Sequence, residues 1–178
     1  MTTFAIRPAL PADILAITAI YGHAVTHGTA SWELTPPDEA EMQRRLGAVL
    51  SGGYPYLVAE RDGALLGYAY AGPYRPRPAY RSTVENSIYV APGAQGSGVG
   101  AALLAALIEA CTMRGFRQMV AVIGDGTGAS VGSRRLHERA GFRLIGVAEK
   151  VGYKHGRWLD QMLMQKELGE ADRTPPQA

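Results

Sequence analysis

The sequence predicts one domain of the α/β class, with a mixed α+β sheet flanked by helices. Three observations support this. The chain has 178 residues, a length that typically forms a single domain. Segments with helical spacing of apolar residues alternate with strand-like segments. A hairpin pattern lies near the middle of the chain, so at least part of the sheet is antiparallel. The domain is expected over residues 1–168, and the polar residues 169–178, with two prolines, as a disordered tail.

The composition of the chain excludes several classes of function. Hydrophobic residues make up 47% of the chain, enough for a full core, and the formal charge of +2 does not indicate binding to nucleic acid or to an anionic membrane. The single cysteine, Cys111, excludes a disulfide framework and a multi-thiolate metal site. His23, His27 and His155 share no ligand spacing with nearby acids, so no metal site is expected. Without a long apolar run or a signal peptide pattern, the protein is expected to be cytoplasmic.

The first half of the chain predicts two helices and a hairpin. Residues 4–7 form a short strand that Pro8 ends, and Pro11 starts a helix. Thr35 is expected to cap a second helix that begins with two prolines and ends at the glycine pair 52–53. Residues 56–60 and 64–69 have strand character on either side of Arg61-Asp62-Gly63, which is a hairpin signal.

The second half alternates strands with helices. Proline interrupts residues 73–78, which are expected to be irregular. The apolar run 119–123 is typical of a strand covered on both faces. In chain order, the elements expected after residue 78 are a strand at 82–90, a helix at 101–114, the buried strand at 119–123, a helix at 130–139 and strands at 142–148 and 159–168.

A glycine-rich turn, residues 95–100, joins the strand at 82–90 to the next helix. Glycines let backbone N–H groups approach a ligand, and a helix N-terminus attracts anions, so the turn suits a phosphate. A plain glycine-rich connection is the alternative. A P-loop is excluded because Gly100 is followed by Ala101 and Ala102 rather than by Lys and Ser or Thr. A dinucleotide-binding fold does not fit either, because the turn lies mid-chain after a hairpin.

Together with several other segments, this turn resembles the GNAT N-acetyltransferases, and the resemblance covers nearly the whole chain. It is closest to the phosphinothricin and methionine sulfone/sulfoximine acetyltransferase branch. The residues that carry it are Gln95, Gly98 and Gly100 and the segments 28–33, 68–73, 83–85, 88–90, 136–138, 141–142 and 152–158. The resemblance implies a cytoplasmic enzyme that uses acetyl-CoA and serves antibiotic or herbicide resistance. It also implies a homodimer, with Trp158 and its neighbours as possible contacts.

The same resemblance implies which residues bind acetyl-CoA. The family has a cofactor-binding asparagine where this chain has Ser130, and an alternative alignment puts Thr127 there. Either hydroxyl keeps one hydrogen bond but not the two-ended contact of an amide. The implied cofactor-binding residues are Ile88, Tyr89, Val90, Gln95, Gly96, Ser97, Gly98, Val99, Gly100, Ala101, Ser130 and Ser133.

Acetyl transfer to an amine needs a base, a polarised thioester and a proton for the thiolate. Cys111 lies on the apolar side of its helix, so direct attack by the amine is expected rather than a covalent enzyme intermediate. Strand alternation places Glu85 with Thr83, Ser87 and Tyr89 on one polar face. The resemblance assigns Glu85 as general base and gives His137 a catalytic role. The residues do not decide which of the two takes the amine proton.

The acceptor is expected to be a small acidic amino acid. Arg75 and Arg77, held by Pro76 and its neighbours, form either a solvated basic loop or a clamp for a carboxylate or phosphinate, since arginine binds such groups with two hydrogen bonds. The resemblance implies the clamp. The resemblance adds Glu85, Asn86 and Ser87, and Trp32 offers an apolar wall. The implied acceptors are L-phosphinothricin, methionine sulfone, methionine sulfoximine and arsenic analogues. The alternatives are an acetyltransferase for another small amine or a protein N-terminus, which would have an open groove, and a catalytically silent CoA-binding sensor.

Overall fold

The computed structural model describes residues 3–125 and 130–176, which form one seven-stranded sheet with four α-helices. The strands lie in the order β1-β2-β3-β4-β5-β7-β6. Their bounds are β1 Ala5–Pro8, β2 Tyr56–Arg61, β3 Ala64–Pro73, β4 Thr83–Val90, β5 Gln118–Gly124, β6 Arg143–Lys154 and β7 Arg157–Glu167. The helices are α1 Ile14–His27, α2 Glu39–Ser51, α3 Val99–Met113 and α4 Ser130–Arg139. The α/β class with a mixed sheet is confirmed.

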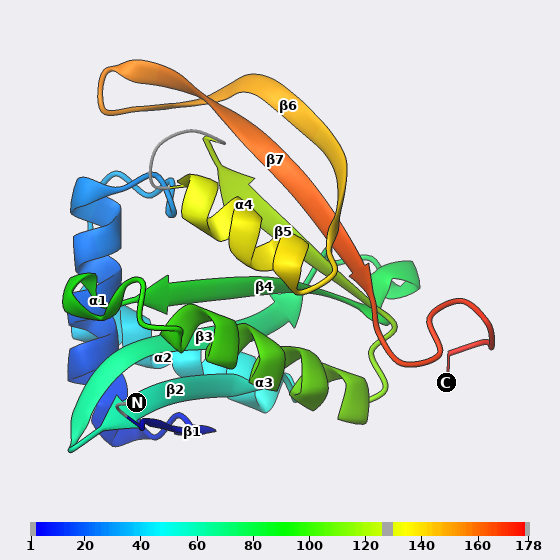
Figure 1. The fold of residues 1–178 in the computed structure, drawn as a ribbon, viewed down its shortest axis with the longest axis horizontal. Coiled ribbons are helices and arrows are strands. Elements are labelled where there is room, and N and C mark those ends of the chain that lie inside the picture. Colours follow the sequence, from blue (N-terminus) through cyan, green and yellow to red (C-terminus); the bar gives the residue numbers. More distant parts are fainter. Residues whose placement is uncertain (1–2, 126–129, 177–178) are drawn as a thin grey trace.

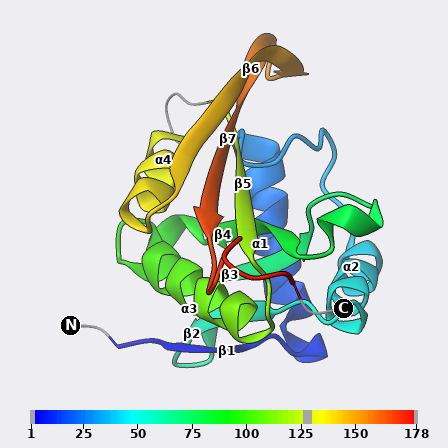
Figure 2. The ribbon, with the colours of Figure 1, turned by 90° about the vertical axis from the view of Figure 1, so that its right-hand side faces the viewer.

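Helices cover both faces of the sheet. Figure 2 shows α1 and α2 on one side and α3 and α4 on the other. The core under α1 and α2 is built on Ile17, Val25, Leu46 and the buried ring of Tyr68. The core under α3 contains Leu103, Leu104, Leu107, Met119 and Met164, all less than 2% exposed. The apolar run 119–123 lies in β5, an interior strand between β4 and β7, and the expected two-sided burial is confirmed.

The one parallel pair of strands, β4 and β5, separates after a short contact. Their register runs from Thr83 opposite Gln118 to Asn86 opposite Ala121. On its other edge β4 pairs with β3 along its whole length, from Val84 to Val90. Figure 1 shows the two strands close together at one end and diverging toward α1 and the start of α3. The sheet is therefore split between β4 and β5 beyond Asn86.

Two sequence predictions of element bounds were wrong. Helix α2 begins at Glu39, later than expected, and its cap is Asp38 rather than Thr35: the Asp38 carboxylate accepts a hydrogen bond from the Glu41 N–H at 2.8 Å. Strands β6 and β7 extend beyond the predicted 142–148 and 159–168 to a tight turn at His155 and Gly156. Register shifts at two points in β6 break its pattern, and most of the strand is exposed at the sheet edge, so its apolar periodicity is weak.

The C-terminal segment lacks a helix or strand through residue 176, but its start packs against the domain. Leu168 and Ala171 are buried, and Arg117 contacts Glu170 at 3.5 Å. No helix within residues 3–125 and 130–176 has both the length and the apolar character needed to cross a membrane. In the same residues, no three His, Cys, Asp or Glu side chains gather in a way that would hold a metal ion.

The cap of α2 gives a test of the local structure. Asp38→Ala should lower the free energy of unfolding by about 1 kcal/mol, because it leaves an N–H of the first helical turn without its acceptor. Urea denaturation measures the change. The matched control is Thr35→Ala at an exposed position outside the helix, for which we expect a change below about 0.5 kcal/mol. A larger effect at Thr35 than at Asp38 would return the cap to the position expected from sequence.

Candidate active site

A cleft of about 1470 Å³ lies where β4 and β5 separate. One wall is formed by α1 and the loop that follows it, and the opposite wall by the start of α3 and by α4. The ends of β4 and β5 form its floor: Ser87 to Val90 on one side and Val122 to Gly124 on the other. The backbone groups on these two facing edges are not paired with each other, so they are available to an extended ligand.

The glycine-rich turn shapes one end of the cleft. Gly96 has φ 76° and Gly98, the N-cap of α3, has φ 87°, a conformation that L side chains rarely adopt. Gln95, Gly96, Gly98, Gly100 and Ala101 line the cleft. Because the first N–H groups of α3 have no partner within the helix, this end of the cleft suits an anion.

Two of the predicted cofactor residues turn away from this end. Among the described residues that line the cleft, Ser97 and Val99 are absent. The Ser97 hydroxyl donates to the Ala94 carbonyl at 2.6 Å, and Val99 is buried in the core. Only their backbone groups remain available to a ligand.

Glu85 shares one face of β4 with Ser87 and Tyr89, as strand alternation predicted, and this face is the one toward α1. It lines the cleft with Ser87 and Tyr89, and its side chain is partly buried. Burial raises the pKa of the Glu85 carboxyl, and the positive charge of Arg75 opposes that shift. A carboxylate with a raised pKa is better matched to take a proton near neutral pH than an exposed one.

His137 reaches the same cleft from the other side of β4. Its ring is 3% exposed, packs edge-on against Phe142, and makes two hydrogen-bonding contacts. Nδ1 is 2.8 Å from the Ser133 carbonyl, and Nε2 is 3.3 Å from Oδ1 of Asn86. Burial lowers the pKa of His137, an effect that the Ser133 carbonyl partly offsets. Glu85 and His137 therefore approach one cleft from opposite faces of β4.

The loop after α1 is held by polar contacts that sequence reasoning missed. The Tyr21 hydroxyl donates to Glu33 at 2.9 Å and lies 2.8 Å from the Ser31 hydroxyl. Arg45 of α2 donates to the same Glu33 carboxylate at 2.6 Å. These residues are far apart in the sequence and have no motif spacing, so only the fold brings them together.

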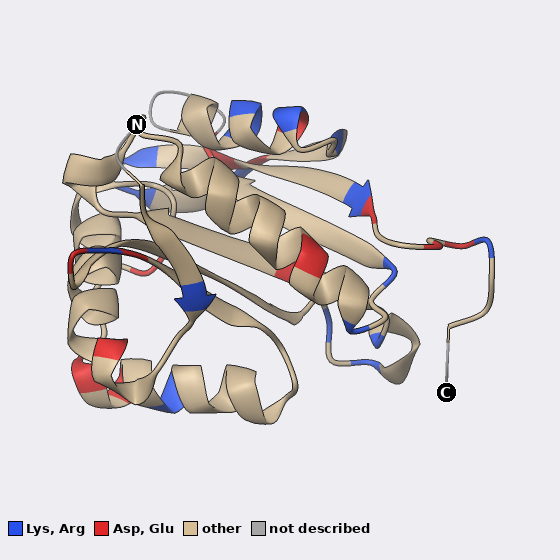
Figure 3. Ribbon diagram, turned by 60° about the horizontal axis from the view of Figure 1, so that its bottom comes forward, with Lys and Arg blue, Asp and Glu red and all other residues tan. Residues whose placement is uncertain are grey.

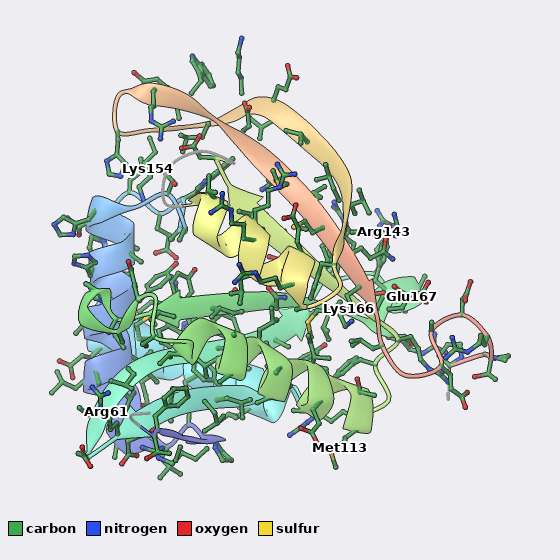
Figure 4. All side chains as sticks on the ribbon, in the orientation of Figure 1. Arg61, Met113, Arg143, Lys154, Lys166 and Glu167 are labelled. Atoms are coloured by element: carbon green, nitrogen blue, oxygen red, sulfur yellow. The ribbon has the colours of Figure 1, made fainter. Side chains whose placement is uncertain are left out.

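The tip of the β6–β7 hairpin closes over this loop. Lys154 is 4% exposed, and its ammonium donates to the Ser31 carbonyl at 2.6 Å. The next residue, His155, donates from Nε2 to the Gly28 carbonyl at 3.1 Å. Figure 4 shows Lys154 at the end of the hairpin nearest α1. Burial lowers the pKa of this ammonium, and the nearby negative charge of Glu33 opposes that shift. The buried positive charge is therefore stabilised by the Ser31 carbonyl and by Glu33.

Trp32, expected from the sequence to offer an apolar wall, lines the cleft next to that hairpin. Two glycines make room for its indole. A Cβ atom on Gly152 would lie 2.5 Å from the Trp32 ring, and a Cβ on Gly124 would collide with the indole nitrogen. The position of Trp32 thus requires glycine, which has no Cβ atom, at residue 124 of β5 and at residue 152 of β6.

Other predicted residues lie in different surroundings. Ser130 and Ser133 line the cleft, and the Ser130 hydroxyl is 3.3 Å from that of Thr29. Thr127, the alternative position for the family's asparagine, lies outside the described residues. Arg75, Pro76 and Arg77 are absent from the described residues that line the cleft, and the Arg75 guanidinium lies over the Tyr74 ring at 5.1 Å.

A group of basic side chains lines the cleft beyond the glycine-rich turn, and the sequence prediction did not include it. Arg135 and Arg139 of α4 lie one turn apart, and Lys166 of β7 completes the group. Figure 3 shows the basic segments of α4, and Figure 4 shows Lys166 near the end of that helix. The spacing of Arg135 and Arg139 along one helix face was a signal that the sequence did contain.

Comparison with known proteins identifies this arrangement. The sequence profile of the acetyltransferase (GNAT) family matches residues 18–142, which include most of α1, the glycine-rich turn and His137. The chain belongs to this family. The resemblance drawn from its motifs is confirmed, and so is the expectation that it is an acetyltransferase.

Relatives of this acetyltransferase are similar over nearly its whole length. It is 55% identical to phosphinothricin N-acetyltransferase of Alcaligenes faecalis over 93% of this chain and 83% of that protein. It is 45% identical to the L-methionine sulfoximine/L-methionine sulfone acetyltransferase of Pseudomonas paraeruginosa over 96% and 98% of the two chains. A crystal structure of the phosphinothricin acetyltransferase of Sinorhizobium meliloti in complex with AcCoA superposes with a TM-score of 0.94, at 49% identity, covering 99% of this chain and 94% of that one.

The glycine pocket of Trp32 gives a test of the cleft wall in this acetyltransferase. Gly152→Ala should displace the indole, because the new methyl group occupies its space. We expect altered Trp32 fluorescence, measured with Trp158 replaced by phenylalanine, and a KM for the acceptor raised about tenfold or more. Gly146→Ala is the matched control on the same strand, since no atom lies within 4 Å of its added Cβ. Equal effects of the two variants would contradict this role of the pocket.

Proposed function

We propose that this acetyltransferase moves an acetyl group from acetyl-CoA to the α-amine of a small acidic amino acid. The acceptors are L-phosphinothricin, methionine sulfone, methionine sulfoximine and arsenic analogues of the same shape. The observation that carries the proposal is one cleft that joins an anion-binding helix end to a partly buried carboxylate with a raised pKa. The relatives that match the whole chain bear the names of these activities.

Acetyl-CoA fits the donor end of the cleft. The N–H groups at the start of α3, with Gly96 and Gly98, would hold the pyrophosphate. The free edge of β4 at Ile88, Tyr89 and Val90 would pair with the amides of the pantetheine arm. Gln95, Gly100, Ala101, Ser130 and Ser133 complete the binding set, with Ser97 and Val99 acting through their backbone alone. Arg135, Arg139 and Lys166, which line the same cleft, supply positive charge for the remaining phosphate.

The acceptor amine attacks the thioester directly in a ternary complex. Cys111 is fully buried, and burial raises its thiol pKa to about 12, so it is no nucleophile. Glu85 takes the first proton of the acceptor ammonium, because its carboxylate faces the α1 side of the cleft. His137, on the donor side of β4, handles the proton that passes to the leaving thiolate. Ser87 and Trp32 position the acceptor, and Asn86 contributes through its backbone, because its side chain contacts His137.

Arg75 and Arg77, with Pro76 between them, bind the acidic group of the acceptor in this proposal. They lie outside the cleft lining, but the charge of Arg75 acts on Glu85, so this loop adjoins the reacting end. Acetylation of another small amine or of a protein N-terminus is the alternative, and it would not use these arginines. A silent CoA-binding sensor would not use Glu85.

We also propose that the enzyme is a cytoplasmic homodimer and that its activity confers resistance to amino-acid antibiotics or herbicides. Exposed apolar side chains on β6 and β7 support the dimer: Leu144, Ile145, Val147, Val151, Tyr153 and Trp158 are 41–61% exposed on the edge strand and its neighbour. Analytical ultracentrifugation tests this directly. A sedimenting mass of one chain at micromolar concentration would reject the dimer.

Acceptor identity is tested by thiol release from acetyl-CoA over a panel of phosphinothricin, methionine sulfone, unmodified amino acids and short peptides. The acidic analogues should be the best acceptors. In the Arg75→Ala, Arg77→Ala double variant, KM for phosphinothricin should rise about 10–100-fold, because a charge-assisted pair of about 1.5–3 kcal/mol is lost. KM for acetyl-CoA serves as the internal control. An unchanged KM for phosphinothricin would favour the open-groove alternative.

The glycine-rich turn is tested by acetyl-CoA affinity. Gly98→Val places a branched side chain at φ 87° and blocks backbone approach, so calorimetry should show affinity weakened at least about tenfold. Gly93→Ala is the control in the preceding turn, because its φ is not positive and its Cβ would meet open space. Unchanged affinity in a folded Gly98→Val variant would reject this turn as the pyrophosphate site.

Glu85→Gln tests the base. It keeps the shape of the side chain and removes its basicity, so kcat should fall about 10²–10⁴-fold with acetyl-CoA affinity preserved. The wild-type rate should fall as pH drops through the raised pKa of Glu85, because the carboxylate becomes protonated. The deficit of the variant should shrink at high pH, where more amine arrives deprotonated. Glu138→Gln, at an exposed ion pair on α4, is the control. Wild-type turnover in Glu85→Gln at pH 7 would transfer the base role to His137.

A further inference from the structure

The contact between Asn86 and His137 has a hydrogen-bonding inconsistency that points to a role for Asn86. Nδ1 of His137 is 2.8 Å from a backbone carbonyl, which only accepts, so Nδ1 carries a proton. A neutral imidazole then has a bare lone pair on Nε2. That atom lies 3.3 Å from Oδ1 of Asn86, which is also an acceptor. With the amide in this orientation, the contact is a hydrogen bond only when His137 is charged.

The other end of the same amide shows the complementary problem. Nδ2 of Asn86 is buried and has no hydrogen-bond partner among the described residues. A buried N–H without a partner is rarer and more costly than a carbonyl with a spare lone pair. Half a turn of the amide about its Cβ–Cγ bond brings Nδ2 to the lone pair of Nε2. The amide then donates to a neutral imidazole, and the unpartnered atom becomes the carbonyl oxygen.

We propose that Asn86 is the positioning residue for His137, and that its amide rotates by half a turn whenever the imidazole gains or loses a proton. With neutral His137, Nδ2 donates to Nε2. With the charged form, Oδ1 accepts from Nε2–H. The ring keeps its place in both states, because Ser133 holds Nδ1 and Phe142 packs against the ring edge-on at 4.9 Å.

The chemistry of the proposed function, on which this inference rests, needs such a partner. An acceptor ammonium loses two protons as its nitrogen forms the amide bond. Glu85 takes the first before attack. The second leaves the nitrogen as the C–S bond breaks and passes through Nε2 to the thiolate. Because Nε2 has a single site for a proton, the Asn86 amide leaves it during each transfer and pairs with it again before and after. His137 is thus neutral at the start, charged in between and neutral at the end, and rotation of Asn86 gives Nε2 a hydrogen bond in each state.

The surroundings of His137 favour the neutral resting form. Burial lowers its pKa, and its remaining partner is an uncharged carbonyl. The charged side chains that line the same cleft are Glu33, Glu85, Arg135, Arg139 and Lys166. Since His137 is 3% exposed and Asn86 6% exposed, solvent does not replace the amide as a partner of Nε2.

The protonation state of His137 in the resting enzyme can be measured by NMR on the wild-type protein. Long-range ¹H–¹⁵N spectra report the charge and the tautomer of each of the four histidines, and a His137→Gln variant identifies the His137 signals. Above the pKa of His137 we expect a proton on Nδ1 and none on Nε2. The side-chain amide signals of Asn86 should shift with the same midpoint as the imidazole. Two results would overturn the proposal. One is a proton on Nε2 of the neutral ring, and the other is an Asn86 amide signal whose chemical shift does not change as His137 titrates.

Two variants then separate positioning from mere packing. Asn86→Asp retains only acceptors and adds a negative charge, so the pKa of His137 should rise by about 1–3 pH units, and the acid limb of the kcat/KM profile should move up with it. Asn86→Leu removes both hydrogen bonds. The pKa should then fall, because the charged form loses the stronger bond. Both variants should lower kcat/KM at pH 7 at least about tenfold, with little change in KM for acetyl-CoA.

Gln118→Glu is the matched control, since it makes the same amide-to-carboxylate change on β5, outside the cleft lining, at a side chain that accepts from Gln165. This control variant should change neither the pKa of His137 nor kcat/KM. Shifts of His137 in the same direction in Asn86→Asp and Asn86→Leu overturn the proposal. The spectra need no turnover. A failed tautomer test therefore leaves the acetyltransferase function standing, and a failed acceptor panel leaves the Asn86–His137 pair standing.

Discussion

Strands β4 and β5 are held together over their first four residue pairs and then separate, and the site depends on this geometry. Each strand remains fully paired on its outer edge, β4 with β3 and β5 with β7, so the split does not undo the sheet. It leaves two facing backbone edges whose N–H and C=O groups need partners from elsewhere. An extended molecule with amides of its own satisfies them, and the helix N-terminus beside the split suits the phosphates of the same molecule.

The split also explains why neighbouring residues have different tasks. Glu85 and Asn86 are the last residues of β4 that pair with β5, and strand alternation sends their side chains to opposite faces. Glu85 therefore meets the side of the cleft formed by α1 and its loop, whereas Asn86 meets His137 on α4. Two titratable groups, Glu85 and His137, therefore lie on two sides of one strand, beside the split in the sheet.

Buried polar contacts hold the walls of this cleft in place. Lys154 joins the hairpin to the loop after α1, and Glu33 joins that loop to α1 and α2 through Tyr21 and Arg45. The ammonium of Lys154 is buried, and a buried charge is costly unless it is bonded, so the loss of its contact with the Ser31 carbonyl would destabilise this wall. The Glu33–Arg45 pair is 35–36% exposed and adds less. Through Ser31, Tyr21, Glu33 and Arg45, this wall of the cleft forms a single network rather than a set of independent side chains.

Local patterns in the sequence determined most elements of the fold, the glycine-rich turn, the face on which Glu85 lies and the family. These features depend on residues close together in the chain, where helical or strand periodicity and turn chemistry act directly. Local patterns did not determine the cap of α2, since Thr35 and Asp38 are both good caps, and only the structure shows that Asp38 accepts from the first helical turn. Tertiary structure alone decided the pocket of Trp32, the Lys154 contact and the partnership of Asn86 with His137. Those contacts join residues 51–123 positions apart, and a hydrogen bond or a missing Cβ at that separation leaves no periodic trace in the sequence.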